Sequence, residues 1–138
     1  MAKIVLISCV SKKVTHPAFA KDLYISSLFR FSYQYALSLC PDRVFILSAK
    51  YGLVPEDAVI SPYNLTLNAM CSKEIQEWSR EASHAINEYT DTENDEFIFL
   101  AGERYRRHLL SSIKNYKIPM KGLRIGEQLA WLRQQLNQ

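Results

Sequence analysis

Small polar and cationic side chains follow three apolar segments of the sequence, and their types suit the binding of an anion. The three runs are Ser8-Cys9-Val10-Ser11-Lys12-Lys13, Ser48-Ala49-Lys50-Tyr51-Gly52 and Gly102-Glu103-Arg104-Tyr105. Ammonium and guanidinium groups beside small residues can hold a phosphodiester, or a negative charge that develops during a reaction. The alternative is that each run is a solvated basic loop after a strand.

Four residues are candidates for catalysis. Glu103 is the best-placed carboxylate, with Asp22 as an alternative, although a carboxylate in the first turn of a helix commonly serves as a cap. Cys9 lies near two lysines that would favour its thiolate, but no partner base is evident, and a small buried residue is the alternative. Asn64 could read the edge of a base or position a water, and Lys50 adds a cation.

Several of the eight tyrosines lie beside these cationic runs. A tyrosine ring can stack on a nucleobase while neighbouring cations hold its phosphate, although a Pro-Tyr-Asn sequence can also serve only as a turn. The residues predicted to bind a substrate are Ser8, Lys12, Lys13, Tyr24, Ser26, Ser48, Tyr51, Gly52, Tyr63, Gly102, Arg104 and Tyr105.

Sequence motifs for metals and nucleotide cofactors are missing. The chain has four glycines and no glycine-rich phosphate loop. His16, His84 and His108 lack the spacing of metal ligands, and the three cysteines include no C-x-x-C pair. We therefore expect no metal and no cofactor, and a reducing, cytoplasmic location.

Charge is segregated along the chain. Residues 1–70 carry seven Lys/Arg and four Asp/Glu (net +3), residues 71–101 carry two and eight (net −6), and residues 102–138 carry eight and two (net +6). If the basic first and last parts meet on one face, they would attract nucleic acid. Solvated faces of separate helices are the alternative.

Hydrophobic patterning predicts alternating strands and helices. Apolar, largely β-branched or aromatic runs indicate buried strands over 3–8, 43–48 and 97–101. Helical periodicity predicts helices over 22–39, 72–89, 103–114 and 125–136, and the stretch 49–69 is expected to be a long loop. This order predicts a single α/β domain over 1–138, built as a three-layer sandwich with a small parallel sheet.

Ligands of such sheets bind beyond the carboxyl ends of the strands, where the three cationic runs would lie. The longest apolar run near the N-terminus, 4–7, is far too short for a signal sequence or a membrane span. We therefore expect no membrane partner, and we favour a monomer.

Five motifs spread over nearly the whole chain resemble a small family of bacterial and phage domains of unknown function. They lie at 8–13, 23–29, 47–53, 62–63 and 101–105, and read SCVSKK, LYISSLF, LSAKYGL, PY and AGERY. The family is distantly similar to the uracil-DNA glycosylase superfamily and to the catalytic domain of archaeosine synthase, which both handle nucleobases. The resemblance implies a uracil-DNA glycosylase-like fold. The Gly-Gln-Asp-Pro-Tyr motif of the uracil enzymes is absent, which argues against uracil as the base.

The resemblance and the cationic strand ends together predict a DNA glycosylase. It would hydrolyse the N-glycosidic bond of a modified base flipped out of DNA, such as a hypermodified phage base, in antiviral defence. One alternative is a transferase that modifies a base of tRNA or DNA, with Lys12 or Cys9 in covalent chemistry. Another is a sensor that binds nucleic acid or a nucleotide without catalysis.

Overall fold

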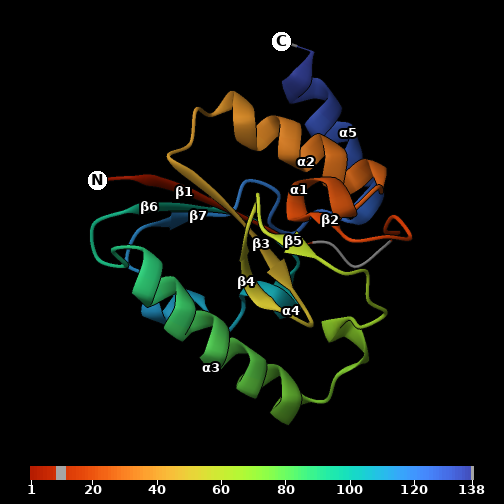
Figure 1. The fold of residues 1–138 in the computed structure, drawn as a ribbon. Coiled ribbons are helices and arrows are strands. Elements are labelled where there is room, and N and C mark those ends of the chain that lie inside the picture. Colours follow the sequence, from red (N-terminus) through yellow and green to blue (C-terminus); the bar gives the residue numbers. More distant parts are fainter. Residues whose placement is uncertain (9–11, 138) are drawn as a thin grey trace.

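The computed structural model describes residues 1–8 and 12–137 and shows a five-stranded sheet between two layers of helices (Figure 1). The strand order is β4-β3-β1-β6-β7. β1, β3, β6 and β7 are parallel, and β4 is antiparallel to β3. The expected three-layer α/β sandwich is confirmed, but its sheet is mixed. The strands are β1 (Lys3–Ser8), β3 (Arg43–Ser48), β4 (Gly52–Pro55), β6 (Glu96–Leu100) and β7 (Tyr116–Lys117).

The central strands are buried on both faces, because alternate side chains of a strand point to opposite sides of the sheet. Val5 and Ile7 of β1 pack in the apolar layer beneath α2 (Ser27–Ser38) and α5 (Ile125–Leu136). Ile4 and Leu6 pack in the other layer, beneath α3 (Ser72–Tyr89). The two apolar layers fix the helices on opposite faces of the sheet.

The segments that follow β1 and β6 lead to opposite faces of the sheet. After β1 the chain passes through α1 (Ala20–Leu23) into α2, whereas after β6 it enters α4 (Glu103–Arg106), which packs against α3 (Figure 1). Because β1 and β6 are neighbours in the sheet, a crevice forms between their carboxyl ends. Open α/β sheets bind ligands at such a topological switch point.

The predicted helix over 22–39 is wrong in its first part. Tyr24 is extended, and it forms an antiparallel bridge with Lys13, so α1 stops at Leu23. The Ile25 amide donates to the Lys12 carbonyl at 2.9 Å. α2 then begins after Ser26, whose hydroxyl accepts from the Phe29 amide at 3.2 Å. Tertiary pairing with the 12–14 segment therefore overrides the helical periodicity.

The predicted loop over 49–69 contains regular structure. A turn at 49–51 reverses the chain into β4, and the turn ends at Gly52, whose positive φ of 73° suits glycine. β5 (Val59–Ile60) pairs with β2 (Ala18–Phe19), and the 3-10 helix η1 (Leu67–Ala69) follows. Sequence patterning does not predict β2, β4 and β5, because each of these strands is only two to four residues long.

The predicted helix over 103–114 is also largely wrong. It consists of the four-residue α4 and the 3-10 helix η2 (Leu110–Ser112), and β7 follows at the edge of the sheet. The predictions for α3 and α5 are confirmed, and Cys71 is the N-cap of α3. Of the helices within 1–8 and 12–137, none combines the length and apolar character that a membrane span requires.

Candidate functional site

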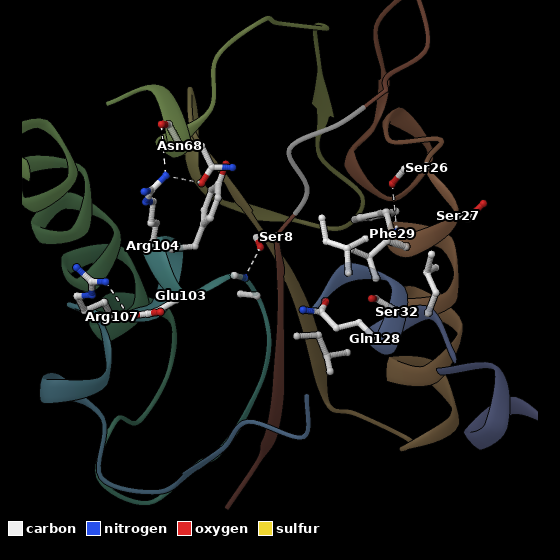
Figure 2. A pocket seen from close by; sticks show the side chains of 17 residues that line it. Ser8, Ser26, Ser27, Phe29, Ser32, Asn68, Glu103, Arg104, Arg107 and Gln128 are labelled. Atoms are coloured by element: carbon white, nitrogen blue, oxygen red, sulfur yellow. Dashed lines mark hydrogen bonds and ion pairs between the residues drawn. The ribbon is translucent and has the colours of Figure 1, made fainter. Parts of the chain in front are cut away.

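A pocket of about 660 Å³ opens at the carboxyl ends of β1 and β6 (Figure 2). One wall consists of the end of β6 and α4, and the opposite wall consists of the first turns of α2 and α5. We call it the switch-point pocket. Its lining residues are Ser8, Ser26, Ser27, Leu28, Phe29, Ser32, Asn68, Leu100, Ala101, Gly102, Glu103, Arg104, Tyr105, Arg107, Ile125, Gln128 and Leu129.

The floor of the pocket is held by a contact between its two strands. The Ser8 hydroxyl at the end of β1 accepts a hydrogen bond from the Gly102 amide, which follows β6, at 3.0 Å. This bond spans 94 residues of sequence. It therefore extends the pairing of β1 and β6 to the strand ends that frame the pocket.

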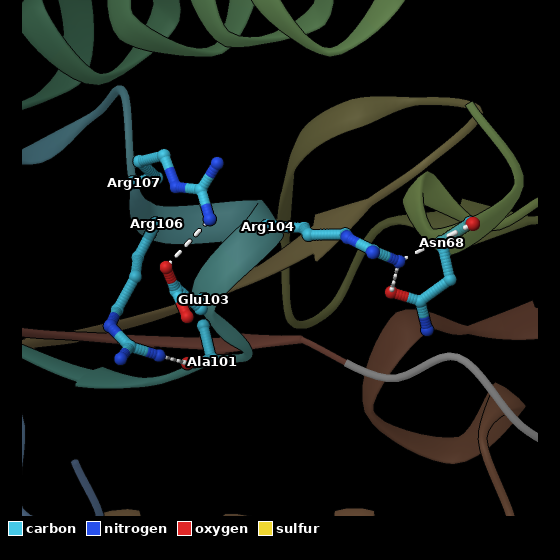
Figure 3. Close-up of polar contacts among 6 residues, drawn as sticks. All are labelled: Asn68, Ala101, Glu103, Arg104, Arg106 and Arg107. Atoms are coloured by element: carbon cyan, nitrogen blue, oxygen red, sulfur yellow. Dashed lines mark hydrogen bonds and ion pairs between the residues drawn. The ribbon is translucent and has the colours of Figure 1, made fainter. Parts of the chain in front are cut away.

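Glu103 places a carboxylate on one wall of the pocket. Its Oε1 lies 2.6 Å from Arg107 Nη2 in an i, i+4 ion pair along α4 (Figure 3). The hydrogen bond from Arg107, and the positive charges of Arg107, Arg106 and Arg104, hold the pKa of Glu103 below its usual 4.5. Glu103 is therefore ionised at neutral pH.

Two further arginines of α4, of which Arg104 also lines the pocket, are anchored by backbone or amide oxygens. Arg104 Nη1 donates to the Asn68 side-chain oxygen at 3.3 Å and to the Asn68 carbonyl at 3.4 Å (Figure 3). Arg106 Nη1 donates to the Ala101 carbonyl at 2.8 Å. Because neutral oxygens hold Arg104, its positive charge is not neutralised by these contacts. This wall of the pocket therefore carries the Glu103 carboxylate and the guanidinium groups of Arg104 and Arg107.

The opposite wall is apolar with interspersed hydroxyls (Figure 2). Phe29 and Leu129 contribute apolar surface, and the buried Ser32 adds a hydroxyl. Gln128 is oriented by a hydrogen bond from its Nε2 to the Leu123 carbonyl at 2.9 Å. Pockets of this size with apolar walls and a few fixed polar groups are typical of small-molecule or nucleoside sites.

A second concavity, of about 550 Å³, lies beside the end of β1. Lys13 Nζ lies 4.4 Å from the centre of the Tyr63 ring, and the hydroxyls of Tyr24 and Tyr63 are 2.6 Å apart. We call this concavity the lysine groove. Its lining residues are Lys12, Lys13, Val14, Thr15, Pro62, Tyr63 and Asn64.

A third concavity, of about 380 Å³, holds the cation that follows β3. Lys50 Nζ lies 5.3 Å from the centre of the Tyr51 ring. The helix α3 contributes Glu74, Glu77 and Glu81 to the same surface, so the carboxylates outnumber the lysine. We call this concavity the acidic groove. Its lining residues are Ala49, Lys50, Tyr51, Gly52, Leu53, Met70, Glu74, Glu77, Trp78, Glu81 and Ala85.

The residues predicted as one site are therefore divided among three concavities. Ser8, Ser26, Gly102, Glu103, Arg104 and Tyr105 line the switch-point pocket. Lys12, Lys13, Tyr63 and Asn64 line the lysine groove, and Lys50, Tyr51 and Gly52 line the acidic groove. Tyr51 and Tyr63 connect the two grooves, because their rings meet edge to face with centroids 5.7 Å apart. Of the four predicted catalytic residues, Glu103 alone is seen to line the switch-point pocket, and Cys9 lies outside the described residues.

Three predicted binding residues are buried, which corrects their expected role. Tyr24 and Tyr105 are 1% and 2% exposed, so neither ring offers a free face for a base to stack on. Tyr24 packs against Phe29 at 5.0 Å between ring centroids, and Tyr105 packs against Trp78 at 5.5 Å. The Ser48 hydroxyl accepts from the amides of the turn that follows β3, so it stabilises that turn.

Two further features of the structure bear on anions and metals. The four-residue α4 is too short to act as a helix dipole, so any attraction of this end for an anion would come from its arginine side chains. Among residues 1–8 and 12–137, no group of three His, Cys, Asp or Glu side chains is arranged to hold a metal ion.

Several residues of the switch-point pocket carry no recognisable signal in the sequence. Asn68 lies in the stretch expected to be a loop, and Ser32 and Gln128 lie within helices whose polar positions look like ordinary surface. Arg107 belongs to the run Arg-Tyr-Arg-Arg, where its pairing with Glu103 at i, i+4 spacing is the one available clue. Phe29 has the spacing of a core residue and lines the pocket as well.

The fold and the pocket together define an α/β protein with a pocket at the switch point of its sheet. The chain belongs to DUF6884, a family of unknown function, whose model matches residues 4–134. No curated protein matches the sequence.

Proposed function

We propose that the protein is a glycosylase that hydrolyses the N-glycosidic bond of a modified base in DNA, with the reacting nucleotide in the switch-point pocket. The observation that carries this proposal is the placement of an ionised carboxylate, Glu103, across the pocket from an apolar wall. The five sequence motifs resemble a family that is distantly similar to nucleobase enzymes, and this distant similarity supports the same chemistry. A modified base is favoured over uracil because the motif of the uracil enzymes is absent from the sequence.

The dimensions and chemistry of the pocket suit a nucleoside. Its volume of about 660 Å³ falls within the range of small-molecule sites. Leu28, Ile125 and Leu129 line the pocket with at least part of their side chains exposed and can contact the faces of a base, and the amide of Gln128 can bond its polar edge. An enzyme that acts on a base must extrude it from the stack, and a pocket of this shape would receive it.

Glu103 is ionised at neutral pH, so it is available as a base or as a counter-charge and is unsuited to the role of an acid. Because its pKa lies below 4.5, the carboxylate carries no proton to donate at neutral pH. A carboxylate near the sugar can accept a proton from water, and it also stabilises the positive charge that develops on the sugar when the glycosidic bond breaks. Arg104 lines the same pocket and would stabilise the negative charge on the departing base.

The reaction then balances as a hydrolysis. A water oxygen forms a bond to C1′ of the sugar while the bond from C1′ to the base nitrogen breaks, and its electron pair leaves with the base. Glu103 accepts the water proton and passes it to solvent or to the base nitrogen. The products are the free base and an abasic sugar that bears a hydroxyl at C1′.

A mass-spectrometric screen for released bases tests the proposal. Purified protein is incubated with unmodified DNA and with DNA that carries modified bases, including hypermodified phage DNA. We expect a released base and an abasic site from at least one modified DNA. The substitution Glu103→Gln should lower the rate by about 10²–10⁴-fold, the usual contribution of a general base. Glu88→Gln is the matched control, because Glu88 is an exposed carboxylate near the C-terminal end of α3.

The other outcomes each overturn the proposal in favour of a stated alternative. An intact glycosidic bond with a nucleoside of changed mass would identify a base-modifying transferase. Binding of DNA without any product from the whole panel would identify a sensor. A wild-type rate in Glu103→Gln would remove the carboxylate from the mechanism.

A further inference from the structure

We infer that the lysine groove binds the phosphate backbone of a single DNA strand next to the nucleotide in the switch-point pocket. The substrate is then a single-stranded polynucleotide rather than a free nucleoside or a duplex. The inference deepens the proposed function and rests on it, because it takes the reacting nucleotide to lie in the switch-point pocket. Three observations support the inference. The groove holds two lysines, hydrogen bonds fix the backbone of these lysines, and the net charge of the lysine groove is opposite in sign to that of the acidic groove.

The backbone that carries the two lysines is held in place. Three backbone contacts join this segment to residues 23–25, just before α2. They are the Lys13–Tyr24 bridge, a hydrogen bond of 2.9 Å from the Val14 amide to the Leu23 carbonyl, and one of 2.9 Å from the Ile25 amide to the Lys12 carbonyl. Lys12 is exposed, and Lys13 is half-buried over the Tyr63 ring. The two ammonium groups are therefore presented from an ordered strand-like segment.

The lining of the lysine groove suits a phosphodiester. The residues seen to line it include two lysines and neither Asp nor Glu, so its side chains carry a net charge of +2. The Thr15 hydroxyl and the Asn64 amide add hydrogen-bond donors, which together with lysines are the usual protein contacts to DNA phosphates. Such contacts position a strand without reading its sequence.

The lysine groove and the switch-point pocket share a wall of aromatic rings. Phe29 lines the pocket, its ring lies 5.0 Å from that of Tyr24, and the Tyr24 ring lies 6.4 Å from that of Tyr63, which lines the groove. Both distances are between ring centroids. Two successive nucleotides could thus lie on either side of this wall, one in the pocket and the other with its phosphate on the lysines.

The neighbouring acidic groove argues against a second strand. The edge-to-face contact of Tyr51 with Tyr63 joins it to the lysine groove. Its Lys50 lies among Glu74, Glu77 and Glu81, so a phosphate backbone that crossed this surface would meet a net charge of −2. A duplex that contacts the lysine groove would bring its second strand toward these carboxylates if it extended across Tyr51. A single strand that runs from the groove to the pocket avoids them.

Fluorescence anisotropy with a labelled oligodeoxynucleotide of mixed sequence tests the inference without requiring any reaction. The same sequence is measured as a single strand and as a duplex over a range of salt concentrations. We expect tighter binding of the single strand. Each of Lys12→Ala and Lys13→Ala should weaken that binding and reduce the slope of log K against log salt by about 0.7, the contribution of one phosphate contact on a single strand.

Matched substitutions keep the result interpretable. Lys73→Ala removes an exposed lysine from α3 and should leave affinity and salt slope unchanged. Lys13→Arg keeps the charge over Tyr63 and should restore the slope, which separates lost charge from lost packing. Lys50→Ala tests the acidic groove separately. We expect this substitution to change the salt slope by less than Lys12→Ala or Lys13→Ala does.

Three results would overturn the inference. They are wild-type affinity and slope in both Lys12→Ala and Lys13→Ala, stronger binding of the duplex, or a larger loss from Lys50→Ala than from the groove lysines. The glycosylase proposal fails separately. If base release depends on Glu103 and does not change in Lys12→Ala or Lys13→Ala, the proposed function stands and the phosphate-binding role of the lysine groove is wrong. If the lysines give salt-dependent DNA binding but no base is released, the role of the groove stands and the proposed function is wrong.

Discussion

Ser8 and Gly102, which are 94 residues apart in the sequence, are joined by a hydrogen bond of 3.0 Å from the Gly102 amide to the Ser8 hydroxyl. The bond connects the carboxyl ends of β1 and β6, from which the chain departs to opposite faces of the sheet. It therefore couples the sheet to the geometry of the switch-point pocket.

Replacement of Ser8 by alanine should test this coupling. Ser8→Ala leaves the Gly102 amide without its present acceptor, and we expect a loss of about 1 kcal/mol in the free energy of unfolding, the usual net contribution of one such bond. Urea unfolding measures the loss. Ser111→Ala, at an exposed serine after α4, is the control and should change stability by less than about 0.5 kcal/mol. Equal stabilities of the two variants would contradict the structural role of Ser8.

The Glu103–Arg107 pair predicts a pH dependence. The carboxylate of Glu103 should titrate below 4.5, because the hydrogen bond and charge of Arg107 favour its ionised form. In Arg107→Ala the pKa should rise toward 4.5. Any base release that needs the ionised carboxylate would then be lost at a higher pH as the solution is acidified. NMR of the Glu103 side-chain carboxyl carbon measures the pKa directly.

A matched variant controls for changes of net charge. Arg80→Ala removes an exposed arginine from α3 and should leave the Glu103 titration unchanged. An unshifted Glu103 midpoint in Arg107→Ala would show that the ion pair of α4 does not determine the charge of the pocket carboxylate.

The hydrogen bond between Tyr33 and Glu56 should stabilise the protein by an amount that decreases at alkaline pH. The Tyr33 hydroxyl donates to Glu56 Oε1 at 2.5 Å, and burial and this bond raise the pKa of Tyr33 above its usual 10.0. In the unfolded chain Tyr33 would ionise near its usual value. The stabilisation is therefore complete below about pH 10 and declines as the pH rises from there toward the pKa of the folded protein.

The substitution Tyr33→Phe measures this contribution. It should reduce the free energy of unfolding by about 1–2 kcal/mol at neutral pH, since it removes a hydrogen bond to a charged group. The difference from the wild type should shrink at about pH 11. Tyr116→Phe, at an exposed tyrosine, is the control. A difference that grows with pH would contradict the assigned bond.

Cys40 offers a stabilising substitution. It follows α2 and has a positive φ of 53°, the left-handed conformation that costs a residue with a Cβ about 1–2 kcal/mol. Cys40→Gly should therefore raise the free energy of unfolding by about 0.5–1 kcal/mol, after the greater chain entropy of glycine is subtracted. Cys40→Ala retains the Cβ and should show no such gain. Thermal unfolding under reducing conditions distinguishes the two variants.

Much of the fold follows from local patterns in the sequence. The runs 3–8, 43–48 and 97–101 are apolar enough to specify buried strands without any partner being known, although the third strand lies one residue earlier, at 96–100. The long periodic helices α3 and α5 are equally clear. The errors fall where pairing partners are distant in sequence. Tyr24 is extended because it pairs with Lys13, and β4 exists because β3 lies beside it. No periodicity within 22–39 or 49–69 reports those partners.

Local patterns predict that three strands end in cationic or small polar residues, and that Glu103, Arg104 and Ser8 share one edge of the sheet. They do not predict how that edge is divided into separate concavities. Asn68 and Gln128 from elsewhere in the chain line the same pocket as Glu103, Lys12 lies in a separate groove, and Lys50 lines a third groove together with three carboxylates of α3. The physical reason is that strand direction brings residues to an edge, whereas the packing of the helices onto the two faces determines which side chains meet there.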